Sequence, residues 1–145
     1  MNIQRVEDRL TEKAFINFPR VLYKGDPNFV AQFDNEVRAA FNRDTNVHFQ
    51  KGDANRWILK NESGNVIGRI AAFYEKEKAE ANYVKSGGCG YFECINSQEA
   101  ANLLFDTAAD WLRSKGIEAM DGPVNFGENE SNWGCLVHGF MPQAY

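Results

Sequence analysis

Residues 88–116 constrain the fold more than any other part of the sequence, because a strand pattern there runs directly into a helix pattern. Residues 90–95 (Gly-Tyr-Phe-Glu-Cys-Ile) are rich in types that favour strands. Asn96, with Glu99 three residues later, has the pattern of an N-cap and a capping box. Apolar residues then recur on one helical face, which ends at Gly116: Ala101, Leu104, Phe105, Ala108, Trp111 and Leu112. The segment therefore predicts a strand followed by an amphipathic helix.

The rest of the chain predicts two early helices and an antiparallel hairpin. Residues 56–60 and 66–74 have strand composition, and the turn signal Glu62-Ser63-Gly64-Asn65 lies between them. Upstream, apolar periodicity predicts a helix over 10–22, interrupted at Pro19 because proline has no amide N–H to donate. The other expected elements are strands over 2–6 and 117–120, helices over 33–42 and 132–138, and a mixed-charge loop or short helix over 75–80.

Composition fits one globular domain over residues 1–145 and disfavours several kinds of partner. Hydrophobic residues make up 43% of the chain, which is enough for a packed core without disulfides or metal. The net charge of −4 lacks the basic excess of a nucleic-acid groove or of a surface for anionic membranes. There is no apolar run of membrane-spanning length and no signal core at the start. The three cysteines have no metal-ligand spacing. We therefore expect a cytoplasmic protein without a metal, a nucleic acid or a membrane as partner.

Five motifs give the chain a resemblance to a known superfamily. They are Tyr23-Lys24-Gly25-Asp26-Pro27-Asn28-Phe29-Val30, Val66-Ile67-Gly68-Arg69-Ile70-Ala71, Trp111-Leu112-Arg113-Ser114-Lys115-Gly116, Gly122-Pro123-Val124-Asn125-Phe126 and Gly134-Cys135-Leu136-Val137-His138-Gly139-Phe140. With the order of elements, they make the chain similar to the GNAT superfamily of N-acetyltransferases, closest to an uncharacterised bacterial branch. The resemblance implies an α/β (α+β) fold with a mixed, mostly antiparallel sheet flanked by helices.

The end of the chain at Tyr145 carries a further expectation. The family's fold continues past the Gly-Phe of the last motif into two more strands, so we expect the fold to be incomplete at its carboxyl end. An incomplete sheet has an open edge that another copy could cover, which predicts a homodimer.

The resemblance also implies an acyl-CoA cofactor such as acetyl-CoA. The pantetheine arm would lie along Phe92, Cys94 and Ile95, and the phosphates would lie at the start of the next helix. The residues there are Asn96, Ser97, Gln98 and Glu99. This segment has no glycine, and the Glu99 carboxylate would repel a phosphate. Two functions therefore stay open: an acyl-CoA-dependent N-acyltransferase with a small-molecule or peptide amine as acceptor, and a non-catalytic binding or assembly module.

Glu93 is the candidate general base. Strand alternation places it on one face with Tyr91 and Ile95, where burial among aromatic residues would suit proton abstraction. The alternative is a structural ion pair with Arg69, which also lies in the middle of a strand. The sequence does not decide between these two roles.

The last motifs supply two more candidate sites. Many family members have a tyrosine as general acid four residues before the Gly-Phe, and this chain has Cys135 there. Cys135 with His138 could instead form a thiol dyad, although cysteine is more often a buried apolar residue. A polar-aromatic cluster could line a substrate pocket or form an ordered loop. Its members are Asn125, Asn129, Asn132 and Trp133.

Overall fold

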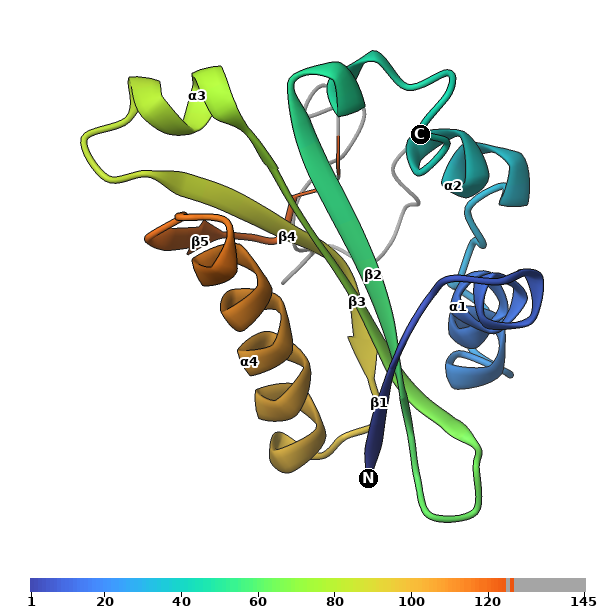
Figure 1. Ribbon diagram of the computed structural model, residues 1–145. Coiled ribbons are helices and arrows are strands. Elements are labelled where there is room, and N and C mark those ends of the chain that lie inside the picture. Colours follow the sequence, from blue (N-terminus) through green and yellow to red (C-terminus); the bar gives the residue numbers. More distant parts are fainter. Residues whose placement is uncertain (125, 127–145) are drawn as a thin grey trace.

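A computed structural model describes residues 1–124 and 126 of the chain. The described residues form one mixed sheet in the order β1-β2-β3-β4-β5, with helices on both faces (Figure 1). The strands are β1 (Asn2–Arg5), β2 (Gly52–Lys60), β3 (Val66–Glu75), β4 (Ser86–Cys94) and β5 (Ala119–Asp121). The helices are α1 (Arg9–Leu22), α2 (Asp34–Ala40), the 3-10 turn η1 (Val47–Gln50), α3 (Lys76–Ala81) and α4 (Gln98–Ser114). The expected α+β class with a mostly antiparallel sheet is confirmed.

The β2–β3 hairpin is the centre of the sheet. Its register runs from Gly52 opposite Glu75 to Lys60 opposite Val66. The turn is held by the Asn61 side chain, whose Oδ1 accepts a hydrogen bond from the backbone N–H of Asn65 at 2.9 Å. Gly64 lies in this turn with φ +81°, a left-handed conformation that glycine adopts without steric cost. The hairpin expected from the sequence is therefore present.

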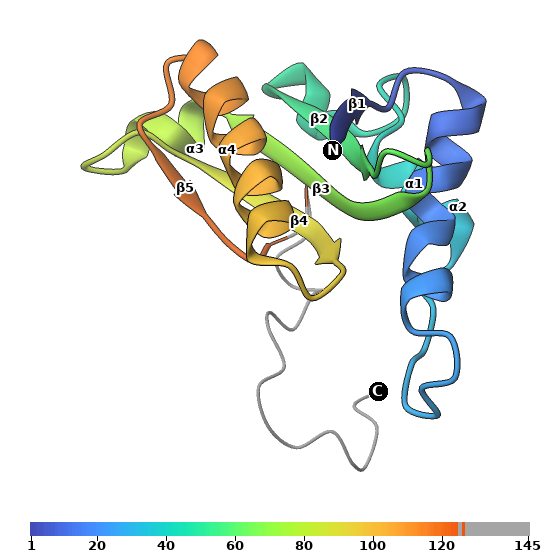
Figure 2. The ribbon, with the colours of Figure 1, turned by 90° about the horizontal axis from the view of Figure 1, so that it is seen from below.

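Helices cover the two faces of the sheet separately, with α4 on one side and α1 and α2 on the other (Figures 1 and 2). On the α4 face, Leu104 and Leu112 are fully buried in a cluster with Leu59 and Ile70. On the opposite face, Phe15 of α1 is fully buried in a separate cluster. Alternation along the central strands sends successive side chains to these two layers.

The structure corrects two of the sequence predictions. Ser97, and not Asn96, caps α4: the Ser97 Oγ accepts a hydrogen bond from the backbone N–H of Ala100 at 3.3 Å. Pro19 does not break the first helix, which runs without interruption to Leu22. Pro19 lies in the last turn of α1, and the helix loses only the hydrogen bond that the N–H of residue 19 would donate. The mixed-charge run forms the short helix α3, and the helix expected over 132–138 lies outside the described residues.

Candidate functional site

A buried ion pair joins the centres of two neighbouring strands. Arg69 of β3 lies opposite Glu93 of β4, and the Arg69 Nε donates a short hydrogen bond to the Glu93 Oε2. The side chain of Arg69 is 6% exposed and that of Glu93 is 20% exposed. The structural alternative for Glu93 is thus the arrangement observed. Within the described residues no hydrogen bond engages the Glu93 Oε1.

Pro19 explains why Arg69 binds the backbone of α1. In a regular helix the N–H of residue 19 would donate to the carbonyl of residue 15, but proline has no N–H. The Arg69 Nη1 donates to that Phe15 carbonyl instead, at 2.8 Å. The Arg69 guanidinium also lies over the Phe15 ring, 4.8 Å from its centroid. Two sequence features thus fix the orientation of Glu93: a proline inside a helix and an arginine inside a strand.

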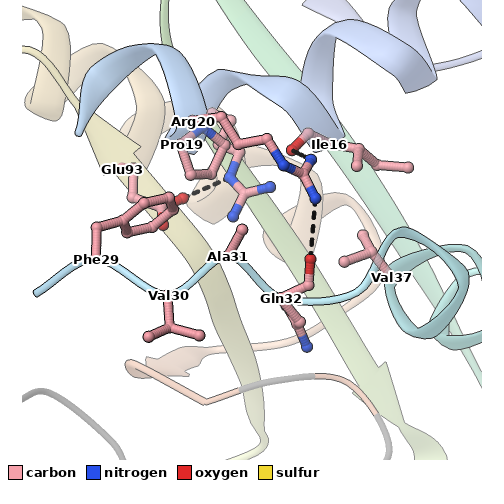
Figure 3. A pocket seen from close by; sticks show the side chains of 10 residues that line it. Ile16, Pro19, Arg20, Phe29, Val30, Ala31, Gln32, Val37 and Glu93 are labelled. Carbon is pink, nitrogen blue, oxygen red and sulfur yellow. Dashed lines mark hydrogen bonds and ion pairs between the residues drawn. The ribbon is translucent and has the colours of Figure 1, made fainter. Parts of the chain in front are cut away.

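Glu93 and Arg69 line a pocket of about 110 Å³ between the sheet and the α1–α2 connection. Figure 3 shows Glu93 beside Phe29 at one end of this pocket and Val37 of α2 at the other. Arg20 of α1 holds the connection in place. Its Nη2 donates to the Gln32 carbonyl at 3.2 Å and to the Asp34 carboxylate at 2.7 Å.

The motif at 23–30 builds the wall of this pocket near Glu93. The backbone N–H of Asn28 donates to the Asp26 side chain at 2.8 Å, which fixes the turn. This turn brings the Phe29 ring against the Tyr23 ring, with centroids 4.8 Å apart. Burial and the negative charge of Glu93 raise the pKa of the Tyr23 phenol, so it keeps its proton at neutral pH. No role for Tyr23 followed from the sequence, although Tyr23 is the first residue of the motif at 23–30.

A β-bulge in β4 immediately precedes Glu93. Gly90 pairs with Ala71 and Glu93 pairs with Arg69, so two residues of β4 lie opposite one residue of β3. Tyr91, in the bulge, has φ +51°, which is an uncommon conformation for a residue with a side chain. Its ring packs against Phe15 and Phe41 on the α1 face. The other bulge residue, Phe92, stacks on Phe105 of α4 with centroids 4.3 Å apart.

Beyond the bulge, β4 is paired on one side only within the described residues. The parallel partner β5 pairs with β4 at Ser86, Gly87 and Gly88. A further backbone bond joins the N–H of Val124 to the Cys89 carbonyl at 2.9 Å. From Gly90 onward, the described partner of β4 is β3. Among the described residues, the edge of β4 away from β3 has no paired strand at Glu93 and Cys94.

The same edge leads to the N-terminus of α4. The Ser97 Oγ accepts a hydrogen bond from the Ala100 N–H, and the Ser97 carbonyl accepts one from the Ala101 N–H at 3.0 Å. The amides of Gln98 and Glu99 are the remaining first-turn donors, and the helix dipole adds a partial positive charge there. The Glu99 carboxylate lies in the same turn and opposes an anion. The first-turn amides of Gln98 and Glu99 could therefore receive a phosphate, whereas the carboxylate of Glu99 would repel it.

The remaining candidates are placed as follows. Burial raises the pKa of the Cys89 and Cys94 thiols, so neither is activated as a nucleophile. Within residues 1–124 and 126 there is no cluster of three groups able to hold a metal ion. No helix in that part of the chain is both long and apolar enough to cross a bilayer. Several predicted residues lie outside the described part: Cys135, Asn125, Asn129, Asn132 and Trp133.

Several solved structures with a similar arrangement are named acetyltransferases. One is a GNAT-family acetyltransferase from Staphylococcus aureus (12% identity, TM-score 0.55, 82% of this chain and 71% of that one). Another is an aminoglycoside acetyltransferase from a soil metagenome, in complex with sisomicin (10% identity, TM-score 0.59, 86% of this chain and 77% of that one). A third is a protein from Clostridium acetobutylicum described as a predicted acetyltransferase, with acetyl-CoA (13% identity, TM-score 0.56, 86% of this chain and 80% of that one). The chain therefore has a GNAT-like fold.

Two curated proteins resemble the chain in sequence. Protein YghO of Escherichia coli is 31% identical over 131 residues, which are 88% of this chain and 32% of that protein. The bacterial ceramide synthase of Caulobacter vibrioides is 31% identical over 129 residues, 88% of this chain and 33% of that protein. The chain thus spans about a third of the length of these relatives. No protein-family model matches it.

Proposed function

We propose that this chain is an N-acyltransferase domain that joins the acyl group of an acyl-CoA to an amine. The observation that carries the proposal is the Glu93 carboxylate, which Arg69 holds at the wall of a pocket in a GNAT-like fold, on the strand that leads to the N-terminus of α4. A CoA ligand at this strand would place its phosphates at the N-terminus of α4, near the amides of Gln98 and Glu99. The acetyl-CoA complex among the similar structures supports this choice of cofactor.

In this proposal, acyl-CoA supplies an activated thioester, and the residues of the chain orient and deprotonate the amine. The Glu93 Oε1 accepts a proton from the amine, directly or through water, while Arg69 holds the other carboxylate oxygen in place. Tyr23 keeps its phenolic proton and so can donate it. The amine nitrogen forms a bond to the acyl carbon as the carbon–sulfur bond breaks, and the leaving thiolate takes up a proton.

A long-chain amine is the acceptor class that we infer. A ceramide is an amide between a fatty acid and a long-chain amino alcohol, so a protein named ceramide synthase forms a bond of the proposed kind. Two exposed apolar side chains before α2 support this class of acceptor. Val30 lines the pocket and is 70% exposed, and Phe33, three residues on, is 71% exposed. Apolar side chains exposed beside a pocket indicate an apolar ligand.

The competing function is a non-catalytic module with the same fold. The carboxylate of Glu99 and the absence of glycine from Asn96 to Glu99 favour it, because both weaken phosphate binding. The predicted homodimer and the cytoplasmic location also stay predictions.

The test is a titration with acetyl-CoA and a long-chain acyl-CoA, followed by amide NMR and by turnover with short and long amines. We expect saturable shifts at Gln98 and Glu99 and amide formation that prefers the long-chain amine. Glu99→Gln should tighten binding about two- to fivefold, the range of one charge near a helix end. Glu93→Gln should abolish turnover without loss of fold, whereas Glu62→Gln, in the exposed hairpin turn, should leave it unchanged. Absence of shifts at Gln98 and Glu99 would favour the non-catalytic module.

A further inference from the structure

A second hollow lies away from the Glu93 pocket, where the β1–α1 and α2–β2 connections meet the start of β2. Its volume is about 280 Å³. The charged residues that line it are Arg5, Glu7, Arg43 and Arg56, and two aromatic rings line it as well, Phe41 and Phe49. Three positive charges against one negative charge make this lining cationic, in a chain whose net charge is −4.

Arg56 is the unusual member of this lining. Its side chain is 12% exposed and lies over the Phe41 ring, 4.4 Å from the centroid. The Arg56 Nη2 donates to the Glu12 Oε1 at a long 3.4 Å. The Arg56 Nη1 is buried and has no hydrogen-bond partner within the described residues. Burial lowers the pKa of the guanidinium, and the Glu12 charge opposes this only in part.

An unsatisfied buried charged donor is costly, so a ligand that satisfies it gains free energy. Glu12 does not fill this need, because its other carboxylate oxygen lies 3.5 Å from the Nε of Arg38. The carboxylate of Glu12 is thus divided between two guanidinium groups. Arg56 keeps donors for a further acceptor.

The other two arginines of the lining are more exposed than Arg56. Arg43 pairs with Asp53 at 2.6 Å and lies over the Phe49 ring, 4.7 Å from its centroid, and its side chain is 56% exposed. Arg5 pairs with Glu7 at 3.4 Å, with both side chains largely exposed. Exposed pairs of this kind are weak, so an anion that binds both arginines can compete with their carboxylate partners. A guanidinium also has donors for more than one acceptor.

We propose that this hollow binds a small organic anion whose phosphate or carboxylate group contacts Arg56, Arg43 and Arg5. The apolar body of the ligand packs on the rings of Phe41 and Phe49. The volume is close to the lower end of ordinary small-molecule pockets, about 300 Å³, so the ligand is small. This site is separate from the proposed acyltransferase site and does not depend on it.

The test is an amide NMR titration of the protein at constant ionic strength with inorganic phosphate, phenyl phosphate and benzoate. We expect saturable shifts at Ala54 and Arg56, with phenyl phosphate tighter than inorganic phosphate because of its ring. Whichever of phenyl phosphate and benzoate binds tighter identifies the anionic group. Arg43→Gln should weaken binding about tenfold, the loss of one charge-assisted hydrogen bond. Arg113→Gln is the control, since Arg113 is an exposed arginine of α4 paired with Asp110.

Several results would overturn the proposal. Linear, unsaturated shifts with every probe would mean that no site exists. Equal affinity in the Arg43→Gln variant would exclude the arginine cluster as the binding group. Shifts confined to Gln98 and Glu99 would report anion binding at the start of α4 and would leave the hollow without a ligand. Equal affinities of phenyl phosphate and inorganic phosphate would remove the aromatic contact from the proposal.

Discussion

Breaking the Arg69–Glu93 pair from each side in turn should give unequal and non-additive losses of stability. Arg69→Met removes the charge that faces Glu93 and also the donor to the Phe15 carbonyl. Glu93→Gln keeps the shape and one acceptor but leaves the Arg69 charge without a carboxylate. The side chain left without its partner is Glu93, 20% exposed, in the first variant and Arg69, 6% exposed, in the second.

The Arg69→Met variant should lose more stability than the Glu93→Gln variant. Removing one partner of a buried pair costs about 3–5 kcal/mol, and an orphaned buried carbonyl costs about 1–3 kcal/mol. Since Glu93 is partly exposed, water compensates its charge, and we expect about 3–4 kcal/mol in all for Arg69→Met. For Glu93→Gln we expect about 2 kcal/mol, because the amide oxygen still accepts a hydrogen bond from Arg69. The double variant has no unpaired charge, so it should be at least about 1 kcal/mol more stable than the sum of the two losses predicts.

Urea unfolding followed by circular dichroism measures all four proteins of this cycle. The four m-values should agree, so that shifts of the midpoint report stability. If the two losses add within about 0.5 kcal/mol, the groups are not coupled and the observed pair does not fix the orientation of Glu93. Equal losses from the two single variants would refute the argument from the Phe15 carbonyl.

Three further variants test the core and the first helix. Leu104→Ala should cost about 2.7–5 kcal/mol, because Leu104 is fully buried between α4 and the sheet, whereas Leu10→Ala, at a position 80% exposed, should stay within about 0.5 kcal/mol in urea unfolding. Hydrogen bonds from the backbone and side chain of Thr11 lower the pKa of Asp8 below its ordinary 3.8. Asp8 therefore stabilises the fold above that pH, and this stability is lost as pH falls through the lowered pKa. Acid unfolding of Asp8→Ala should show less loss over this range than the wild type, and equal curves would exclude the effect.

The elements of the fold were predictable because their patterns are local. The hairpin follows from two strand patterns around Glu62-Ser63-Gly64-Asn65, and α4 follows from its apolar face and from Gly116. The cap of α4 was misplaced by one residue because Asn96 and Ser97 are both good caps. The chain direction at the end of β4 decides between them. That direction is accompanied by a hydrogen bond from the Ser97 N–H to the Ile95 carbonyl at 2.7 Å. No sequence pattern predicts this bond.

The site was predictable only where strand register fixes it. Glu93 and its two alternative roles followed from alternation along β4, and Arg69 followed as the neighbouring cation. The bulge at Tyr91 did not follow, because it depends on how β3 and β4 align over their whole length. Tyr23 was missed since its contact with Phe29 is made by a turn that brings the connection back over the sheet. The cationic hollow joins residues 5 to 56, and no local pattern marks such a cluster.

Pro19 connects the helix to the buried pair, and this connection can be tested without touching either charge. Because proline lacks an N–H, the Phe15 carbonyl depends on Arg69 for its hydrogen bond. Pro19→Ala supplies a helical N–H to that carbonyl, and a carbonyl has two lone pairs, so Arg69 keeps its own bond. In the Pro19→Ala background, Arg69→Met should therefore cost about 1 kcal/mol less than in the wild type, because the carbonyl is no longer orphaned. Urea unfolding of the four proteins measures this difference. An unchanged cost of Arg69→Met would show that Arg69 acts only through Glu93, and that the proline in α1 has no part in shaping the site.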